Sequence, residues 1–186
     1  SGAGAEEFAK EQGLEMVDDN MYFATPKTME WIEKLKQESK KNGTVGCVVL
    51  DKQGNLTAGT STGGMFKKRW GRIGDSPVIG AGTYADNNSC AVSCTGHGEY
   101  FIRHAVAFDV CARYKYLKES VEKAADYIIH TELNTNAGNG GLIAVDKLGN
   151  IAMPYNSGGM FRGFLYKEKG RPEIKKLSLI HISEPT

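Results

Sequence analysis

Several features are absent from the sequence, and each absence excludes a class of protein. No run of apolar residues approaches the roughly 18 needed to cross a bilayer, so we expect no membrane-spanning helix. The 23 Lys and Arg balance 22 Asp and Glu with no extended basic block, which leaves no patch for binding nucleic acid. The Lys-rich stretch 34–41 also contains Glu38 and is typical of a solvated helix face. With 40% apolar and 24% charged residues, the 186-residue chain has the composition of one globular domain.

A cysteine framework is also absent. The four cysteines, Cys47, Cys90, Cys94 and Cys111, stand inside apolar runs, and no two form a Cys-x-x-Cys pair. This arrangement predicts free, buried thiols, which are more typical of a reducing compartment such as the cytoplasm. Cys90 and Cys94 are followed by His97, but no second ligand pair stands at a compatible spacing. We therefore predict no metal site.

The pattern of apolar residues predicts an α+β fold. Residues 5–12 and 25–40 have helical character, the second segment with Thr25 as N-cap and Pro26 in the first turn. Residues 44–50 form a β-rich run that ends in a polar, Gly-containing turn, as in a hairpin. Residues 90–94 predict a further strand, and two later helices are expected to turn apolar stripes to the core. These stripes are Phe101, Ile102, Ala105, Val106 and Phe108, then Val121, Ala124, Ala125 and Ile128.

An internal repeat connects two distant parts of the chain. The segment VLDKQGNL at 49–56 recurs as AVDKLGNI at 144–151, and each copy leads to Gly-Gly-Met-Phe, at 63–66 and 158–161. Both features recur 95 positions later, from 51 to 146 and from 63 to 158. Two copies are too few for a solenoid, so the repeat predicts two hairpins of related layout with helices between them.

Thr44 follows Gly43 at the predicted change from helix to strand, where glycine permits unusual backbone dihedrals. A Gly-Thr step alone says little, because threonine often opens a strand. The segments that follow Thr44 are more informative, because they place polar, Gly-rich turns at the predicted strand ends. These turns are Thr60-Ser-Thr-Gly-Gly64, Gly71-Arg-Ile-Gly-Asp-Ser-Pro77, Gly80-Ala-Gly82 and Thr95-Gly-His-Gly-Glu99.

The chain contains, in this order, the motifs GTVG, LDKQGNL, TSTGG, GRIGDSP, GAGTYA, SCTGHGE and GGLIAVD, and the resemblance that they carry covers roughly residues 1–175. In this order they resemble the isoaspartyl peptidase and plant-type asparaginase branch of the N-terminal nucleophile hydrolases. The resemblance implies an αββα sandwich, incomplete here because the family's preceding segment is absent, and self-cleavage at Gly43–Thr44. It also implies that residues 1–43 end an α subunit and that 44–176 form a β subunit with the nucleophile and pocket. Residues 177–186 depart from the family and are expected to be a non-native tail.

The resemblance makes Thr44 the nucleophile. A threonine hydroxyl is weakly nucleophilic and needs a base, which the α-amine freed by cleavage supplies because it titrates near ~7.7–8. Thr62 matches the threonine that hydrogen-bonds the nucleophile. Thr95 and Gly96 match the pocket motif that stabilises the oxyanion.

The implied substrate is L-asparagine or a β-aspartyl dipeptide, from which L-aspartate is released. Arg72 would bind the free α-carboxylate through two hydrogen bonds, and Asp75 would pair with the α-ammonium. Ile73, Gly74, Thr95, Gly96, His97 and Gly98 complete the expected substrate-binding set. We expect no cofactor for the chemistry, a structural Na⁺ or K⁺ at most in the absent segment, and an (αβ)2 heterotetramer of the complete protein.

Other hypotheses fit parts of the pattern less well. His97 with Ser93 or Ser61 resembles a serine-hydrolase pair, but the family uses the threonine amine as base. The turn 59–64 opens like a phosphate loop, yet Met-Phe follows where Lys-Ser/Thr would bind phosphate. Glycosylasparaginase typically has Asp before its nucleophile, where this chain has Gly43. An inactive truncated fragment, acting only as an interaction module through unpaired strand edges, is the alternative from a different class.

Overall fold

The computed structural model describes residues 2–17, 25–26, 29, 43–65, 72–168 and 171–175. They fall into two compact units, one drawn from Ser1–Gly43 and Gly63–Ile73, the other from Thr44–Thr62 and Gly74–Thr186. In the first unit, helix α1 (Ala3–Glu11) confirms the helix predicted at 5–12. The Thr25 carbonyl accepts a hydrogen bond from the Met29 amide at 2.9 Å, as in a first helical turn. Most of the predicted helix 25–40, and the whole tail 177–186, lie outside the described residues.

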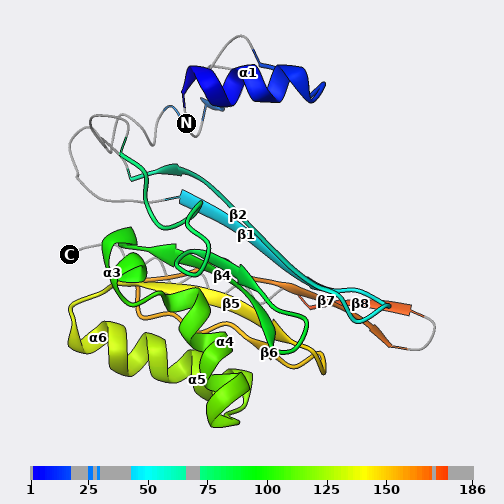
Figure 1. The fold of residues 1–186 in the computed structure, drawn as a ribbon, viewed down its shortest axis with the longest axis vertical. Coiled ribbons are helices and arrows are strands. Elements are labelled where there is room, and N and C mark those ends of the chain that lie inside the picture. Colours follow the sequence, from blue (N-terminus) through cyan, green and yellow to red (C-terminus); the bar gives the residue numbers. More distant parts are fainter. Residues whose placement is uncertain are drawn as a thin grey trace. The chain divides into compact units, whose positions relative to one another are not determined.

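The second unit is built on an antiparallel sheet in the order β3–β4–β5–β6. Its strands are β3 (Thr83–Ala85), β4 (Cys90–Gly96), β5 (Gly140–Asp146) and β6 (Ile151–Ala152). One face of this sheet is covered by helices α4 (Val106–Leu117), α5 (Val121–Tyr127) and α6 (Leu133–Thr135) (Figure 1). The paired strands β1 (Gly43–Leu50) and β2 (Leu56–Gly64) lie along the other face. A further antiparallel pair is formed by β7 (Phe164–Glu168) and β8 (Arg171–Lys175). The predicted α+β class is confirmed, with helix, sheet and hairpin as successive layers.

Strand β4 is buried on both faces because it lies in the middle layer. Its even-numbered residues, Cys90, Val92 and Cys94, join the main core beneath the helices, while Ala91 packs with Leu56 of the hairpin. Successive side chains of a strand point to opposite faces, so Ser93 and Thr95 share the hairpin side with Ala91. The hairpin side of β4 therefore becomes polar towards its carboxyl end.

The helical segment differs from the prediction at its first helix. The apolar stripe from Phe101 is divided between α3 (Gly98–Arg103) and α4 (Val106–Leu117), because Ala105 adopts a left-handed φ of 45°. Phe101 of α3 and Val106 of α4 are fully buried, whereas Ile102 and Phe108 are 42% and 43% exposed. The predicted place of Ile102 and Phe108 in the core was therefore wrong. The predicted second stripe is confirmed: α5 (Val121–Tyr127) and the π-helical turn η2 (Ile128–Glu132) bury its residues, and α6 (Leu133–Thr135) follows.

The internal repeat forms two turns with the same hydrogen bonds. Asp51 Oδ1 accepts from the amides of Gln53 and Asn55 at 2.9 and 2.7 Å, and Asp146 Oδ1 accepts from those of residues 148 and 150 at 2.8 and 2.9 Å. The two hairpins then diverge, since β2 has nine residues and β6 two. Pro154, which has no N–H to donate, interrupts the second return strand. The predicted pair of related hairpins is confirmed, and only the first has a long return strand.

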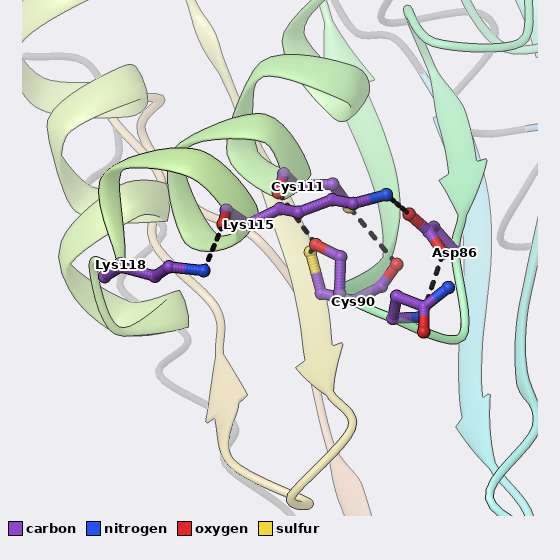
Figure 2. A network of polar contacts seen from close by, with 7 residues as sticks. Asp86, Cys90, Cys111, Lys115 and Lys118 are labelled. Carbon is purple, nitrogen blue, oxygen red and sulfur yellow. Dashed lines mark hydrogen bonds and ion pairs between the residues drawn. The ribbon is translucent and has the colours of Figure 1, made fainter.

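Buried thiols help to fix the helical layer to β4. The Cys111 thiol donates to the Cys90 carbonyl at 3.2 Å, and Lys115 of α4 forms an ion pair with Asp86 at 2.9 Å (Figure 2). The neighbouring Cys90 thiol and burial raise the pKa of Cys111, so it remains a neutral donor. The prediction of free, buried thiols holds for Cys90, Cys94 and Cys111 but was wrong for Cys47, which is exposed.

Of the helices described, none combines the length and apolarity required to cross a membrane.

Candidate active site

The sheet-facing side of the β1–β2 hairpin carries the predicted nucleophile. Val48 and Leu50 pack against the cluster around Ala91, and strand alternation places Thr44 on the same face of β1. The Thr44 hydroxyl donates to the hydroxyl of Thr62 on β2 at 3.3 Å. The structure thus brings together two of the predicted catalytic residues, whose roles in the reaction remain predictions.

The end of β4 holds Thr95 and Gly96, the predicted oxyanion residues. They pair with Gly141 and Gly140 of β5. Gly96 has a φ of 154°, and a Cβ there would overlap the Asn139 carbonyl and lie 2.6 Å from the Phe101 ring. Only glycine fits this position, which allows the backbone to turn sharply from β4 into the segment preceding α3.

The segment after Gly96 includes His97 and Gly98 and leads into α3. The His97 amide donates to the Asn139 carbonyl at 2.9 Å, and the imidazole lies near the Tyr100 ring, with centroids 6.4 Å apart. The backbone of this predicted substrate-binding segment is therefore anchored to the residue that precedes β5.

Asp75 lies against this turn. Its side chain is only 5% exposed, and a Cβ at Gly98 would lie 2.7 Å from Asp75 Oδ1 and 3.4 Å from the Gly74 Cα. The Asp75 carbonyl accepts from the Val78 and Gly82 amides at 2.9 and 3.1 Å, which holds the residue in a tight turn. Burial, and then the charge of Asp75, raise the pKa of the Cys94 thiol. The fold thus brings four predicted substrate-binding residues, 74, 75, 97 and 98, into one region.

Arg72 and Ile73 belong to the first unit together with Gly43. Both side chains are exposed, and the Arg72 guanidinium lies 3.9 Å from the Met65 sulfur, a thioether that is a weak acceptor. Their placement relative to Asp75 lies outside what the structure describes. The joint binding of a substrate by Arg72 and Asp75 therefore remains a prediction.

Two groups near the site were not assigned a role from the sequence. Asn156 accepts from the Gly140 amide at 2.8 Å and donates to the carbonyls of Ile129 and Gly138 at 3.2 and 2.9 Å. It thereby supports the backbone beside Gly96. The motif Pro-Tyr-Asn contains no signal of this role, because its partners are distant in sequence.

The second group is a pair of hydroxyls. Ser93 entered the sequence argument only as a possible partner of His97, whereas its hydroxyl lies 2.6 Å from that of Thr60. The signal in the sequence was the spacing, because Thr60 and Ser93 stand two residues before Thr62 and Thr95. Within the part of the chain described, no group of three or more His, Cys, Asp or Glu is placed to bind a metal ion.

The antiparallel β layers, the helices that cover one face and the threonine near the start of β1 match the α+β fold of the N-terminal nucleophile hydrolases. A family model described as asparaginase matches residues 1–172. The chain belongs to this asparaginase family, as the resemblance of its motifs predicted.

Curated relatives agree with the family assignment. Isoaspartyl peptidase of Salmonella typhimurium is 46% identical over 179 residues, which are 89% of this chain and 57% of the relative. That of Escherichia coli is 42% identical over 192 residues, 91% of this chain and 60% of the relative. The mouse isoaspartyl peptidase/L-asparaginase is 42% identical over 172 residues, 86% and 51% of the respective lengths. The chain thus spans between half and three fifths of these relatives.

Proposed function

We propose that this chain is part of a self-processing amidohydrolase. Its substrates are L-asparagine and β-aspartyl dipeptides, from which it releases L-aspartate after autocleavage at Gly43–Thr44. The observation that carries the proposal is the hydroxyl contact between Thr44 and Thr62 at 3.3 Å, on the hairpin face that packs against β4. The names of the relatives, isoaspartyl peptidase and L-asparaginase, support this substrate class.

Autocleavage uses the same hydroxyl that later acts on the substrate. The Thr44 oxygen attacks the Gly43 carbonyl carbon, and the peptide nitrogen leaves as the α-amine of Thr44, so the amide becomes an ester. Water then hydrolyses the ester and releases the carboxylate of Gly43 and the Thr44 hydroxyl. The products are a chain ending at Gly43 and a chain beginning at Thr44, whose free amine titrates near ~7.7–8.

In substrate turnover this amine accepts the proton of the Thr44 hydroxyl as the oxygen attacks the side-chain carbonyl of the substrate. In the uncleaved chain the Thr44 hydroxyl donates its one hydrogen to Thr62. After cleavage that hydrogen goes to the amine, so the Thr62 hydroxyl orients the Thr44 oxygen as a hydrogen-bond donor. The Thr95 hydroxyl and the Gly96 amide stabilise the oxyanion of the tetrahedral intermediate. The Thr44 ammonium returns the proton to the leaving group of the substrate, which departs as ammonia from L-asparagine or as the amine of the second residue from a β-aspartyl dipeptide. Water then hydrolyses the aspartyl ester and regenerates Thr44.

Substrate recognition depends on the free α-groups of the aspartyl unit. A buried carboxylate is stable when it faces a cation, so Asp75, at 5% exposure beside Gly98, suits the α-ammonium. Arg72 supplies the guanidinium for the α-carboxylate. Gly43 before the nucleophile and the names of the relatives favour this branch over glycosylasparaginase.

The complete protein would contain α and β subunits cut from one precursor and assembled as an (αβ)2 heterotetramer. The chemistry needs no cofactor, because the nucleophile, the base and the oxyanion donors are all protein groups. A Na⁺ or K⁺ would have a structural role only, in a part of the relatives that this chain does not cover.

Aspartate release by the full-length protein tests the proposal. L-Asparagine and a β-aspartyl dipeptide are the substrates, and an α-aspartyl dipeptide is the control. We expect turnover of the first two, abolished by Thr44→Ala, and none of the third. If only α-aspartyl dipeptides are cleaved, or if Thr44→Ala retains wild-type activity, the proposal is wrong. Turnover by the full-length protein but not by the 186-residue chain would identify the chain as an inactive fragment.

A further inference from the structure

A second hydroxyl pair lies one step along the strands from the Thr44–Thr62 contact. The hydroxyls of Thr60 on β2 and Ser93 on β4 are 2.6 Å apart, and the Thr60 hydroxyl also lies 3.1 Å from the Gly82 carbonyl. Ser93 is 3% exposed, so this contact between the hairpin and the central sheet is shielded from water.

The number of protons fixes the direction of these hydrogen bonds. Each hydroxyl has one hydrogen to donate, and a carbonyl oxygen only accepts. Because Thr60 donates to Gly82, the hydrogen in the 2.6 Å contact comes from Ser93. The Gly82 carbonyl also accepts the Cys94 amide at 2.9 Å, so both lone pairs of this oxygen are used. The relay from Ser93 to Thr60 to Gly82 is complete without water.

Gly46 allows the two layers to approach at this point. A Cβ at Gly46 would overlap the Ser93 hydroxyl and lie 3.0 Å from the Ser93 Cβ. Any larger residue would push β1 away from β4 or displace the Ser93 side chain. The absence of a side chain at position 46 is thus a condition for the bond between Thr60 and Ser93.

Strand periodicity connects this pair to the reacting groups. Residues two apart in a strand point to the same face, about 6.6 Å apart along it. Thr60 therefore precedes Thr62 on one face of β2, and Ser93 precedes Thr95 on one face of β4. The hydrogen bond joins the strand that orients the nucleophile to the strand that ends in the oxyanion donors.

We propose that Thr60 and Ser93 are positioning residues that set the distance between the Thr44 nucleophile and the Thr95–Gly96 oxyanion site. The inference depends on the proposed function, because it assigns the pair an effect on that reaction. The relay also extends towards the substrate site, since the Gly82 amide donates to the Asp75 carbonyl at 3.1 Å. Loss of the Thr60 hydroxyl lets the hairpin move relative to β4, which affects the chemical step more than substrate binding.

The test compares Thr60→Val, Thr60→Ser and Ser93→Ala in the full-length protein. Thr57→Val is the matched control, because Thr57 is exposed on the opposite face of β2. The first-order rate of cleavage at Gly43–Thr44, and kcat and KM on a β-aspartyl dipeptide, are measured beside the melting temperature. Small misplacements of reacting groups cost up to about 100-fold in rate. We expect Thr60→Val and Ser93→Ala to lower cleavage and kcat about 10- to 100-fold, with KM changed less than about threefold.

Two further results separate positioning from general destabilisation. Thr60→Ser retains the hydroxyl and is expected to recover cleavage and kcat to within about threefold of wild type. The double variant Thr60→Val/Ser93→Ala is expected to be no slower than the slower single variant, because both changes remove one bond.

The outcomes distinguish the inference from the function on which it depends. A wild-type protein that neither cleaves nor turns over substrate contradicts the proposed function and removes the catalytic role claimed for the pair. An active wild type with Thr60→Val and Ser93→Ala at wild-type kcat contradicts the inference alone, as does Thr60→Ser as slow as Thr60→Val. If Thr60→Val fails to fold, Ser93→Ala and Thr60→Ser decide, because both preserve the packing around the hairpin more closely.

Discussion

The Asp75 carboxylate occupies the space beside Gly98 that a side chain at position 98 would need, with a Cβ there 2.7 Å from Asp75 Oδ1. The two residues are 23 positions apart in the sequence. Their contact places a buried acidic group beside the turn that carries the proposed oxyanion donors, and it explains why the turn has glycine at this position.

Gly98→Ala is expected to displace Asp75 and weaken binding of the substrate ammonium. We expect KM to rise about tenfold, which corresponds to roughly 1.4 kcal/mol, with a smaller change in kcat. Gly59→Ala is the matched control, because a Cβ at Gly59 meets no atom within 4 Å. Steady-state kinetics on a β-aspartyl dipeptide measure both effects, and an unchanged KM in Gly98→Ala would refute this role of Asp75.

Thr62→Val removes the acceptor of the Thr44 hydrogen bond while preserving the shape of the side chain. Autocleavage and kcat are expected to fall about 100-fold, since an unoriented nucleophile seldom reaches its base or its target. Quenched time courses analysed by mass spectrometry give both rates. A Thr62→Val protein that cleaves and turns over at wild-type rates would show that the 3.3 Å contact has no catalytic consequence.

Asn156→Leu is expected to destabilise the backbone around Gly138 and Gly140, which lies beside Gly96. The substitution leaves the Gly140 amide and two carbonyl partners without their side-chain hydrogen bonds, and an unsatisfied buried group costs about 1–3 kcal/mol. Urea unfolding should show that Asn156→Leu lowers the free energy of unfolding by about 2–3 kcal/mol. The control Asn134→Ala, at an exposed position, should lower it by less than about 0.5 kcal/mol. Equal unfolding midpoints of the two variants would contradict this account.

The ion pair between Asp86 and Lys115 predicts a pH-dependent contribution to stability. Hydrogen bonds from the Asn88 amide and from Lys115 lower the pKa of Asp86 below its ordinary value. A lowered carboxyl pKa stabilises the folded state above the unfolded pKa of about 3.9, and this contribution is lost as the pH falls through the folded pKa. Asp86→Asn should therefore lower the free energy of unfolding by up to about 1 kcal/mol at pH 6. The difference in this free energy between the variant and wild type should shrink below about pH 4. A constant difference between pH 6 and pH 3 would exclude this linkage.

The elements with strong local signals were predictable from the sequence. The β-rich run 44–50 and the repeated Asp-Lys-x-Gly-Asn turns predicted both hairpins, and the same turn hydrogen bonds form at Asp51 and Asp146. The break at Ala105 was not predictable, because alanine carries no local preference for a left-handed φ. Cys47 was predicted to be buried from its apolar neighbours, although alternation along β1 turns it to the exposed face.

The candidate site was predictable only in part. Thr44, Thr62, Asp75 and the turn 95–98 came from the order of motifs, and the fold brings them into the same unit. The contribution of Thr60, Ser93 and Asn156 depends on contacts between strands and loops distant in sequence, such as the 33 residues between Thr60 and Ser93. Such contacts follow from how the layers stack, which periodicity within one strand does not reveal.

The most direct test of the central claim, that Thr44 becomes an N-terminal nucleophile, is the time course of the intact mass of the purified full-length precursor. The account predicts a first-order loss of precursor and the appearance of two fragments, one of which yields Thr-Val-Gly-Cys on N-terminal sequencing. Thr44→Ala should remain uncut under the same conditions. A precursor that turns over a β-aspartyl dipeptide while its Gly43–Thr44 bond stays intact would contradict the account.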